Sequence, residues 1–204
     1  PFEVTIQPVQ NGFRISARYF FGAPVSGTAG VRSVIEETIY RPPGWSDFSF
    51  GDAVENRSRV RTFPRIETPI SGEHDFSLPI KIGRRPMELS ISAEVRDASH
   101  QSVETTYSTI LHPGGLYLGI KTEGWVGPAG RETTVRFVGV TPEGHARNVA
   151  AIITVLRREW HTVAKQSAGG SIAYESQPVD VWIASGLVKT PGAWSFIPPR
   201  SGIY

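Results

Sequence analysis

A strict alternation of apolar and polar side chains is the feature that most constrains how this chain can fold. It extends over nine residues from Met87 to Val95, and shorter stretches repeat it at 2–7 and 13–19. Because successive side chains of a β-strand point to opposite faces, each stretch has one apolar and one polar face. Strands of this kind build antiparallel sheets that are packed on one side. The sequence therefore predicts sheets with one buried and one hydrated face.

Turn-forming residues separate these stretches at short intervals. The chain has 204 residues, of which 21 are glycine and 16 are proline, and these gather at sites such as Pro42-Pro43-Gly44. The segment 147–160 contains good helix formers, but its four consecutive β-branched residues at 152–155 favour a strand. Many short strands with regular turns predict an all-β fold of antiparallel β-sandwiches.

A proline beside two glycines at 112–115 divides the sequence into two parts with similar landmarks. Three landmarks recur after 118 or 120 residues, namely Pro24 at Pro142, Tyr40 at Trp160 and Phe76 at Phe196. This spacing predicts two tandem β-sandwich domains, at 1–112 and 113–204. The first part continues through two more strands after its last landmark, whereas the second stops at Tyr204. We therefore expect the second domain to lack its C-terminal hairpin and the natural sequence to continue.

Charge and composition exclude several classes of protein. The 21 basic and 19 acidic residues give a formal net charge of +2, and Arg57, Arg59 and Arg61 are interpreted as a solvated strand face. A nucleic-acid partner is not expected, because such binders gather positive charge on one surface. No apolar run reaches the ~20 residues that span a bilayer. The chain has no cysteine, which excludes disulfides, a thiolate metal site and a cysteine-derived thioester within these residues.

No residue pattern points to catalysis or to a cofactor. The five histidines lack the spacing of a metal motif, and the sequence has neither a Gly-x-Ser-x-Gly elbow nor a phosphate-binding loop. The carboxylates of Glu36 and Glu37 would point to opposite faces of a strand, so they could not act together on one substrate. We therefore expect no catalytic, cofactor-binding or metal-binding residue, and no enzyme.

The segment from Ala17 to Gly27, ARYFFGAPVSG, resembles a strand and turn of an alpha-2-macroglobulin domain, where two aromatic residues precede Gly-x-Pro-Val-x-Gly. Two further pieces resemble the bacterial branch of that family: 43–45 with 48–52, and 124–127 with 157–161. Phe2-Glu3-Val4 resembles the first strand of the third macroglobulin domain. The resemblance covers essentially the whole chain. It implies two consecutive immunoglobulin-like macroglobulin domains, the third and fourth in eukaryotic-style counting.

The chemistry of this segment can be interpreted without the resemblance. Gly22 and Gly27 give the backbone freedom around a turn, while Pro24 fixes φ and ends strand pairing. Tyr19 belongs to the apolar face, so we expect it to be buried with its hydroxyl beside a partner at the rim.

The resemblance implies a function for the parent protein. In this family a protease cuts an exposed bait segment, the molecule rearranges, and a Cys-Gln thioester can bind the attacker. This chain has no cysteine and no obvious bait segment, so the resemblance implies a non-catalytic part of the shell that positions those regions. Its implied partners are neighbouring macroglobulin domains and target proteases. The implied location is the periplasm or cell envelope, where the parent could be a lipoprotein.

The tryptophans leave a second hypothesis open. Trp45 and Trp125 lie in loops rich in glycine or proline, where each could cap a sandwich, contact a neighbouring domain or bind a sugar. Together with Phe48 they are candidate interface residues. The alternative function is a carbohydrate-binding or adhesin module of a cell-surface protein. Trp182 and Trp194 lie in predicted strands and are expected in the core.

Overall fold

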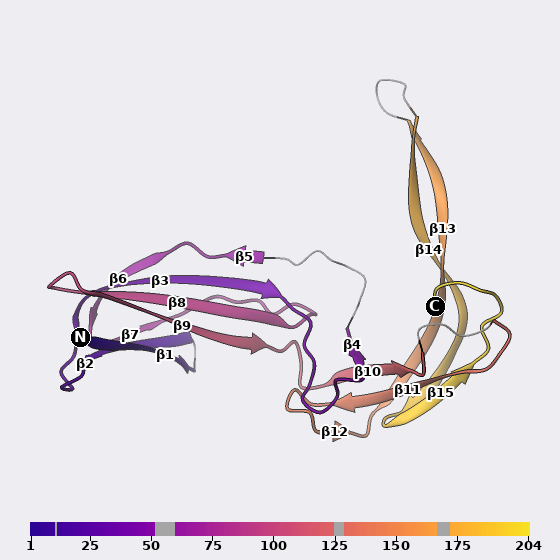
Figure 1. Ribbon diagram of the computed structural model, residues 1–204, viewed down its shortest axis with the longest axis horizontal. Helices are drawn as coiled ribbons and strands as arrows, with labels where there is room; N and C mark the ends of the chain where they lie inside the picture. Colours follow the sequence, from indigo (N-terminus) through magenta and orange to yellow (C-terminus); the bar gives the residue numbers. More distant parts are fainter. Residues whose placement is uncertain (11, 52–59, 125–128, 167–171) are drawn as a thin grey trace. The chain divides into compact units, whose positions relative to one another are not determined.

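The structure is a computed structural model that describes residues 1–10, 12–51, 60–124, 129–166 and 172–204. The regular secondary structure within these ranges consists of β-strands alone (Figure 1). The strands form three sheets in which all pairs are antiparallel. The prediction of an all-β chain of antiparallel sheets is therefore confirmed. Among the described residues there is no helix with the length and apolar character needed to cross a membrane.

The chain forms two compact units. The first comprises Pro1–Tyr40 and Gly51–Gly115, and the second comprises Arg41–Phe50 and Leu116–Tyr204. The boundary between Gly115 and Leu116 falls at the proline-glycine loop that the sequence indicated. However, the sequence did not indicate that residues 41–50 fold with the second unit. The division into tandem macroglobulin domains at 1–112 and 113–204 stays a prediction.

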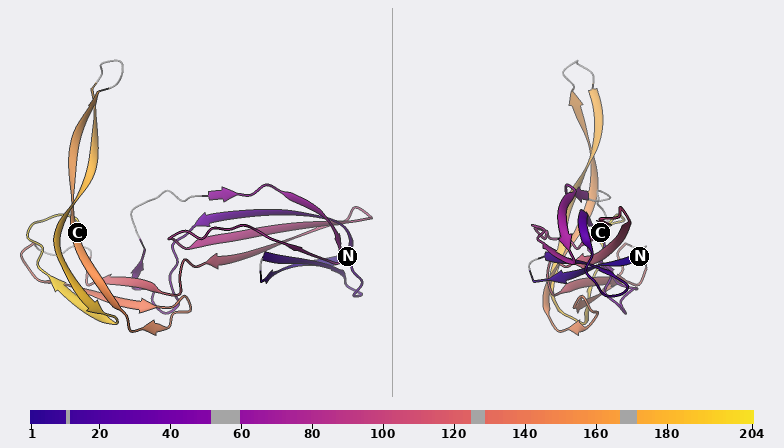
Figure 2. Two further views of the ribbon diagram at one scale, coloured as in Figure 1. Left: turned by 180° about the vertical axis from the view of Figure 1, so that it is seen from behind. Right: turned by 90° about the vertical axis from the view of Figure 1, so that its left-hand side faces the viewer.

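One sheet of eight strands makes the first unit. Its order is β1-β2-β7-β6-β3-β8-β9, with β5 paired to β3. The strands are β1 (Phe2–Val9), β2 (Gly12–Tyr19), β3 (Ser26–Glu37), β5 (Val60–Thr62), β6 (Ile66–Ser71), β7 (Glu73–Phe76), β8 (Met87–Asp97) and β9 (Ser102–Leu111). Only the pair Ser71–Glu73 joins β6 to β7. The sheet therefore folds into two layers, and Figures 1 and 2 show β1 and β2 lying across β3, β8 and β9.

The core of the first unit consists of the apolar positions of the alternating stretches. From one layer it receives Phe2, Val4, Ile6, Phe13, Ile15 and Ala17, and from the other Leu89, Ile91, Ala93 and Val95. The four residues of β8 are completely buried, each with 0% exposure. The alternation therefore predicted both the strands and the side of each strand that faces the core.

The turn after β2 is held by main-chain hydrogen bonds. Gly22 N donates to Tyr19 O at 2.7 Å, and Tyr19 N donates to Ala23 O at 2.9 Å. Gly22 has a φ of +94°, a conformation that favours glycine. Gly27 is constrained differently, because a Cβ atom there would collide with the carbonyl of Arg96 on β8. The freedom expected at both glycines is thus needed at Gly22 alone, and at Gly27 the need is for space.

The second unit contains a five-stranded sheet and a two-stranded ribbon. The sheet has the order β12-β11-β10-β4, with β15 also paired to β11, and the ribbon pairs β13 with β14. The strands are β4 (Ser49–Phe50), β10 (Tyr117–Thr122), β11 (Thr133–Val140), β12 (Ala146–Arg147), β13 (Ala150–Gln166), β14 (Ile172–Lys189) and β15 (Gly192–Phe196). The strand predicted within 147–160 is confirmed as part of β13.

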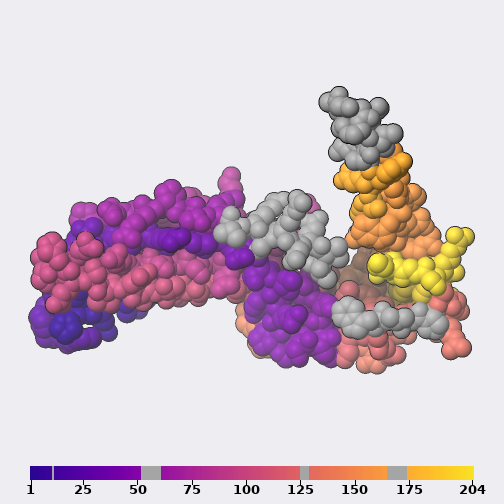
Figure 3. Space-filling model, turned by 45° about the horizontal axis from the view of Figure 1, so that its top comes forward, coloured from indigo at the N-terminus to yellow at the C-terminus, as the bar shows by residue number. Residues whose placement is uncertain are grey.

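The ribbon explains why one prediction about the tryptophans is wrong. Trp182 lies on β14 and is 62% exposed, although its position in a strand suggested the core. Its side of the ribbon has no second layer among the described residues. Trp194 on β15 is half-buried and stacks on Phe196 with ring centres 5.9 Å apart. Figure 3 shows the outer part of β13 and β14, in orange, projecting from the rest of this unit.

Candidate functional site

Two of the three predicted interface residues come together in the second unit. Trp45 packs edge-on against Phe48 with ring centres 5.4 Å apart, and its Nε1 donates a 2.8 Å hydrogen bond to Gly144 O. Both rings pack against the buried cluster of Phe50, Val138 and Val140. The geometry is that of a cap over this cluster. Trp125 lies outside the described residues, and an interface role for these three side chains stays a prediction.

An ion pair flanks this aromatic cap. Lys121 Nζ on β10 lies 2.6 Å from Asp47 Oδ2 and 5.9 Å from the centre of the Phe48 ring. The hydrogen bond from Lys121 lowers the pKa of Asp47 from its ordinary value. Segment 45–50 is therefore fixed to the sheet at three points: the Trp45 indole, the Asp47 carboxylate and the pairing of β4 with β10.

A buried carboxylate lies at the β8–β9 turn of the first unit. Asp97 is 5% exposed and accepts hydrogen bonds from Ser99 N at 2.9 Å, Ser99 Oγ at 2.8 Å and Gln101 N at 3.0 Å. Tyr19 Oη adds a fourth bond to Asp97 at 3.0 Å. The bond from the Ser99 hydroxyl contributes most to lowering the pKa of Asp97, while the bond to Asp97 raises the pKa of Tyr19. The expected rim partner of Tyr19 is thus present, although the ring is half-buried.

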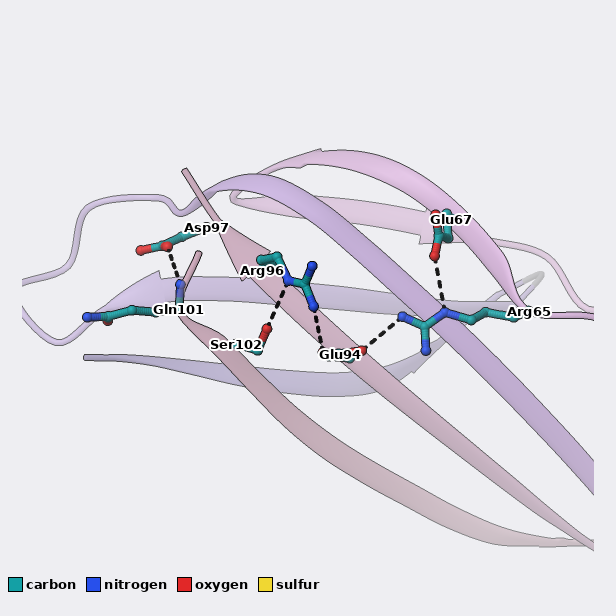
Figure 4. Close-up of polar contacts among 7 residues, drawn as sticks. All are labelled: Arg65, Glu67, Glu94, Arg96, Asp97, Gln101 and Ser102. Carbon is teal, nitrogen blue, oxygen red and sulfur yellow. Dashed lines mark hydrogen bonds and ion pairs between the residues drawn. The ribbon is translucent and has the colours of Figure 1, made fainter. Parts of the chain in front are cut away.

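The outer face of β6, β3 and β8 carries a chain of paired charges (Figure 4). Arg65 Nη2 donates to Glu94 Oε2 at 2.9 Å, and Glu94 also lies 3.7 Å from Arg96 Nη2. The bond from Arg65 is the main cause that lowers the pKa of Glu94. Arg96 Nε also donates to Ser102 Oγ on β9 at 3.2 Å. These exposed pairs neutralise one another, as expected of a solvated face rather than of a binding site for a charged ligand.

The predicted basic strand face is only partly described. Arg61 lies on β5 and is exposed, whereas Arg57 and Arg59 fall outside the described residues. A shallow pocket elsewhere in this unit is lined by Arg14, Glu73, His74 and Asp75. Its charges are paired, because Arg14 donates to both carboxylate oxygens of Asp75 at 2.6 and 2.8 Å. This pairing leaves little free charge for a ligand.

The described residues show no constellation that could bind a metal. Within these ranges no three His, Asp or Glu side chains gather in a way that could hold an ion. Glu36 and Glu37 are successive residues of β3, so they point to opposite faces, and Glu37 lies 3.8 Å from Arg85 in an ion pair. The pair is therefore not arranged as two carboxylates facing one substrate.

Sequence reasoning missed one group of side chains, on the outward side of the ribbon. Leu156, Trp160 and Trp182 are 40%, 59% and 62% exposed there. Residues 149–156 are mostly apolar at both odd and even positions. A run of this kind is typical of a strand that is covered on both faces. The exposure of Leu156 could therefore not be predicted from it.

The antiparallel sheets, folded into two layers in the first unit, are those of an immunoglobulin-like β-sandwich protein. A family model, the bacterial alpha-2-macroglobulin MG5 domain, matches residues 5–113, which is more than half of the chain. The chain therefore belongs to the bacterial alpha-2-macroglobulin family. The numbers three and four in eukaryotic-style counting are not tested by this match and stay a prediction.

Solved structures support the same fold. The native form of E. coli alpha-2-macroglobulin matches 97% of this chain at 15% identity with a TM-score of 0.64, and the match covers 14% of that chain. A mutant of Salmonella alpha-2-macroglobulin matches 97% at 12% identity with a TM-score of 0.63, over 15% of its length. E. coli alpha-2-macroglobulin activated by porcine elastase matches 99% at 14% identity with a TM-score of 0.58, over 22% of that chain. The present chain thus spans a small part of each. A search of curated protein sequences found no match.

Proposed function

We propose that this chain is a non-catalytic structural segment of a bacterial alpha-2-macroglobulin that traps proteases. The observation that carries the proposal is the family match over residues 5–113, to which solved alpha-2-macroglobulins add a similar fold over 97% of the chain. The segment forms part of a shell, and the bait and thioester regions lie elsewhere in the parent chain. Its partners are neighbouring macroglobulin domains and, through the complete protein, the trapped proteases.

The local geometry supports a scaffold role. Turns and loops are fixed by specific contacts, as Tyr19 to Asp97 and Trp45 to Gly144 show. Several exposed charges of the β-sheet faces are paired, as Arg14 with Asp75 and Arg65 with Glu94 show. Elements held by internal contacts of this kind suit a part that positions other domains. The proposed location of the parent protein is the periplasm or cell envelope, with or without a lipid anchor.

The proposal is tested with the complete product of the gene. It is mixed with elastase, and cleavage of a small peptide substrate is compared with cleavage of a large protein substrate. A trapped protease keeps its active site but is shielded from large substrates, so the peptide is still cut while the protein is spared. If the gene product protects the large protein substrate no more than the small peptide, at every ratio of gene product to elastase, the proposal is refuted. Elastase without the gene product is the control, since it cuts both substrates freely.

The alternative, a carbohydrate-binding module, has less support at the residue that suggested it. The indole N–H of Trp45 is already bonded to Gly144 O, and its ring packs on Phe48. A sugar platform needs an open ring face and free hydrogen-bonding groups beside it. Trp45 therefore suits a packing role better than a sugar-binding one.

A further inference from the structure

A short segment from the first half of the chain belongs to the second unit. The first unit leaves off at Tyr40 and resumes at Gly51, and residues 41–50 between them fold with residues 116–204. The strands on either side of this segment, β3 and β5, pair with each other within the first unit. The first unit therefore holds both ends of a segment whose side chains serve the second unit. We call residues 41–50 the strap.

The strap provides half of the small apolar cluster of the second unit. The cluster joins Trp45, Phe48 and Phe50 of the strap to Tyr117 of β10 and to Val138 and Val140 of β11. Phe50 is only 5% exposed, and Pro42 of the strap is almost completely buried. Aromatic side chains contribute the largest apolar areas to a core. Without the strap, this side of β10 and β11 would lose three aromatic neighbours.

The surface that receives the strap leaves space for it. A Cβ atom at Gly119 on β10 would collide with the ring of Phe50, and a Cβ atom at Gly144 would collide with the carbonyl of Pro43. Gly144 also has a φ of +89°, a conformation that favours glycine. Close approach at two glycines is the fit of a ligand in a formed site.

Polar contacts fix the position of the strap along this surface. Trp45 Nε1 donates to Gly144 O at 2.8 Å, and Lys121 Nζ donates to Asp47 Oδ2 at 2.6 Å. Strand β4 of the strap pairs with β10, which has β11 on its other side (Figure 1). The strap thus adds a strand to the edge of a sheet and places side chains on its surface. Proteins bind extended peptides in the same way.

The strap also has local structure of its own. Trp45 N donates to Pro42 O at 3.3 Å, and Phe48 N donates to Trp45 O at 3.1 Å. Gly44 has a φ of +82° between these turns. The two prolines and the turns restrict the conformations of the free segment, which lowers the entropy lost on binding. A peptide of this sequence should therefore bind without the rest of the first unit.

We propose that the second unit contains a binding site for an extended peptide and that the strap is its ligand. The site takes a short segment with aromatic side chains and one carboxylate, and the first unit supplies this segment within the same chain. The second unit is complete only when the strap is bound, so its folding depends on the first unit. This inference goes beyond the proposed function and does not depend on protease trapping.

Peptide complementation in the complete gene product tests the proposal. A glycine-serine linker of equal length replaces the strap, and a fluorescent peptide with the sequence of residues 41–50 is added. A tethered segment has an effective concentration on the order of 1 mM, so the peptide should bind the linker variant below about that concentration. The wild type, whose own strap fills the site, should bind the peptide at least about tenfold more weakly. Fluorescence anisotropy measures both affinities.

Matched glycine variants show where the peptide binds. In the linker variant, Gly119→Ala fills the space of the Phe50 ring and should weaken peptide binding about tenfold or more. Gly114→Ala adds the same methyl group where nothing lies within 4 Å, so the affinity should not change. A peptide that carries Trp45→Ala should also bind about tenfold more weakly, as loss of a buried tryptophan does.

A milder variant keeps the test valid if the linker variant does not fold. Trp45→Ala together with Asp47→Ala weakens the strap in place, so the peptide should bind this variant more tightly than the wild type. Circular dichroism shows whether the β-sheet signal is kept. Tryptophan fluorescence reports on the second unit, because all five tryptophans lie in its part of the sequence. Bound peptide should raise the melting temperature that this fluorescence measures.

Several results would overturn the proposal. These are no peptide binding to either strap variant, equal binding to the wild type and the variants, and equal effects of Gly119→Ala and Gly114→Ala. A linker variant whose tryptophan fluorescence melts like that of the wild type would also contradict it. The assay contains no protease, so its failure leaves the trapping function standing. A failure to trap proteases likewise leaves the strap site standing.

Discussion

The hydroxyl of Tyr19 donates a 3.0 Å hydrogen bond to Asp97 Oδ2 and so joins the end of β2 to the β8–β9 turn. These residues are 78 positions apart in the chain. The bond connects the two layers of the first unit at the rim of its core, beside the turn that resembles other macroglobulin domains. The pair should therefore contribute to holding the layers together.

Removing the Tyr19 hydroxyl tests this contribution. Tyr19→Phe keeps the ring, which packs on Phe2 and Phe21, but it leaves the buried carboxylate with one partner fewer. We expect the melting temperature to fall by about 3–6 °C, the range for one lost hydrogen bond in a domain of this size. Tyr107→Phe is the control, because no partner of its hydroxyl is found among the described residues. Equal shifts in both variants would contradict a specific role for the Tyr19 bond.

The Asp97 carboxylate should make stability depend on pH. Hydrogen bonds, first from the Ser99 hydroxyl, lower the pKa of Asp97 in the folded protein. Such a group stabilises the fold fully above its unfolded pKa of about 3.9 and loses this contribution as the pH falls through the folded value. The stability difference between the wild type and Asp97→Asn should thus be largest above about pH 5 and shrink in acid. Urea unfolding from pH 7 to pH 3 measures it, and a constant difference would refute the assignment.

The buried side of β8 predicts a large cost for truncating a core side chain. Ile91 has 0% exposure and lies in the main apolar cluster. Ile91→Ala should lower the free energy of unfolding by about 3 kcal/mol, since it removes buried methylene groups and leaves a cavity. Ile66→Ala makes the same change at a side chain that is 44% exposed, and it should cost about 1 kcal/mol or less. Urea denaturation gives both values, and similar costs would mean that the layers are not packed at Ile91.

The close approach of β3 to β8 at Gly27 predicts that even one methyl group is not tolerated. A Cβ atom at residue 27 would meet the carbonyl of Arg96, which is main chain and cannot turn aside. We expect Gly27→Ala to destabilise the protein by about 2 kcal/mol or more. Gly115→Ala is the control, because a Cβ atom there meets nothing within 4 Å. A neutral Gly27→Ala in thermal unfolding would show that the strands can separate slightly at this point.

The indole of Trp45 predicts a stability effect in the second unit. Trp45→Phe removes the donor to Gly144 O but keeps an aromatic ring beside Phe48. The expected loss is about 1 kcal/mol, the typical net value of one hydrogen bond. Trp182→Phe serves as the comparison, since that indole is 62% exposed and should change stability little. If the two variants unfold alike, Trp45 is not a cap over the Phe50 cluster.

Much of the first unit could be predicted from local pattern. Alternation identified β1, β2 and β8 and the side of each that faces the core, because the period of two is a property of the strand itself. The chemistry of tyrosine also predicted a polar partner for Tyr19, although it could not name Asp97. At the candidate site, the sequence brought Trp45 and Phe48 forward for their loop setting, and the structure shows them in contact with each other.

The sequence by itself determined the all-β class, the faces of the strands and, through the turn at 17–27, the family. Only the tertiary structure decided that residues 41–50 fold with the second unit, that Gly27 faces a carbonyl and that Trp182 is exposed. The reason is physical. Period and turn chemistry act between neighbours in the chain, whereas pairing, close approach and cover depend on segments that are far apart in sequence. An apolar strand face is visible in a sequence, but the layer that covers it is not.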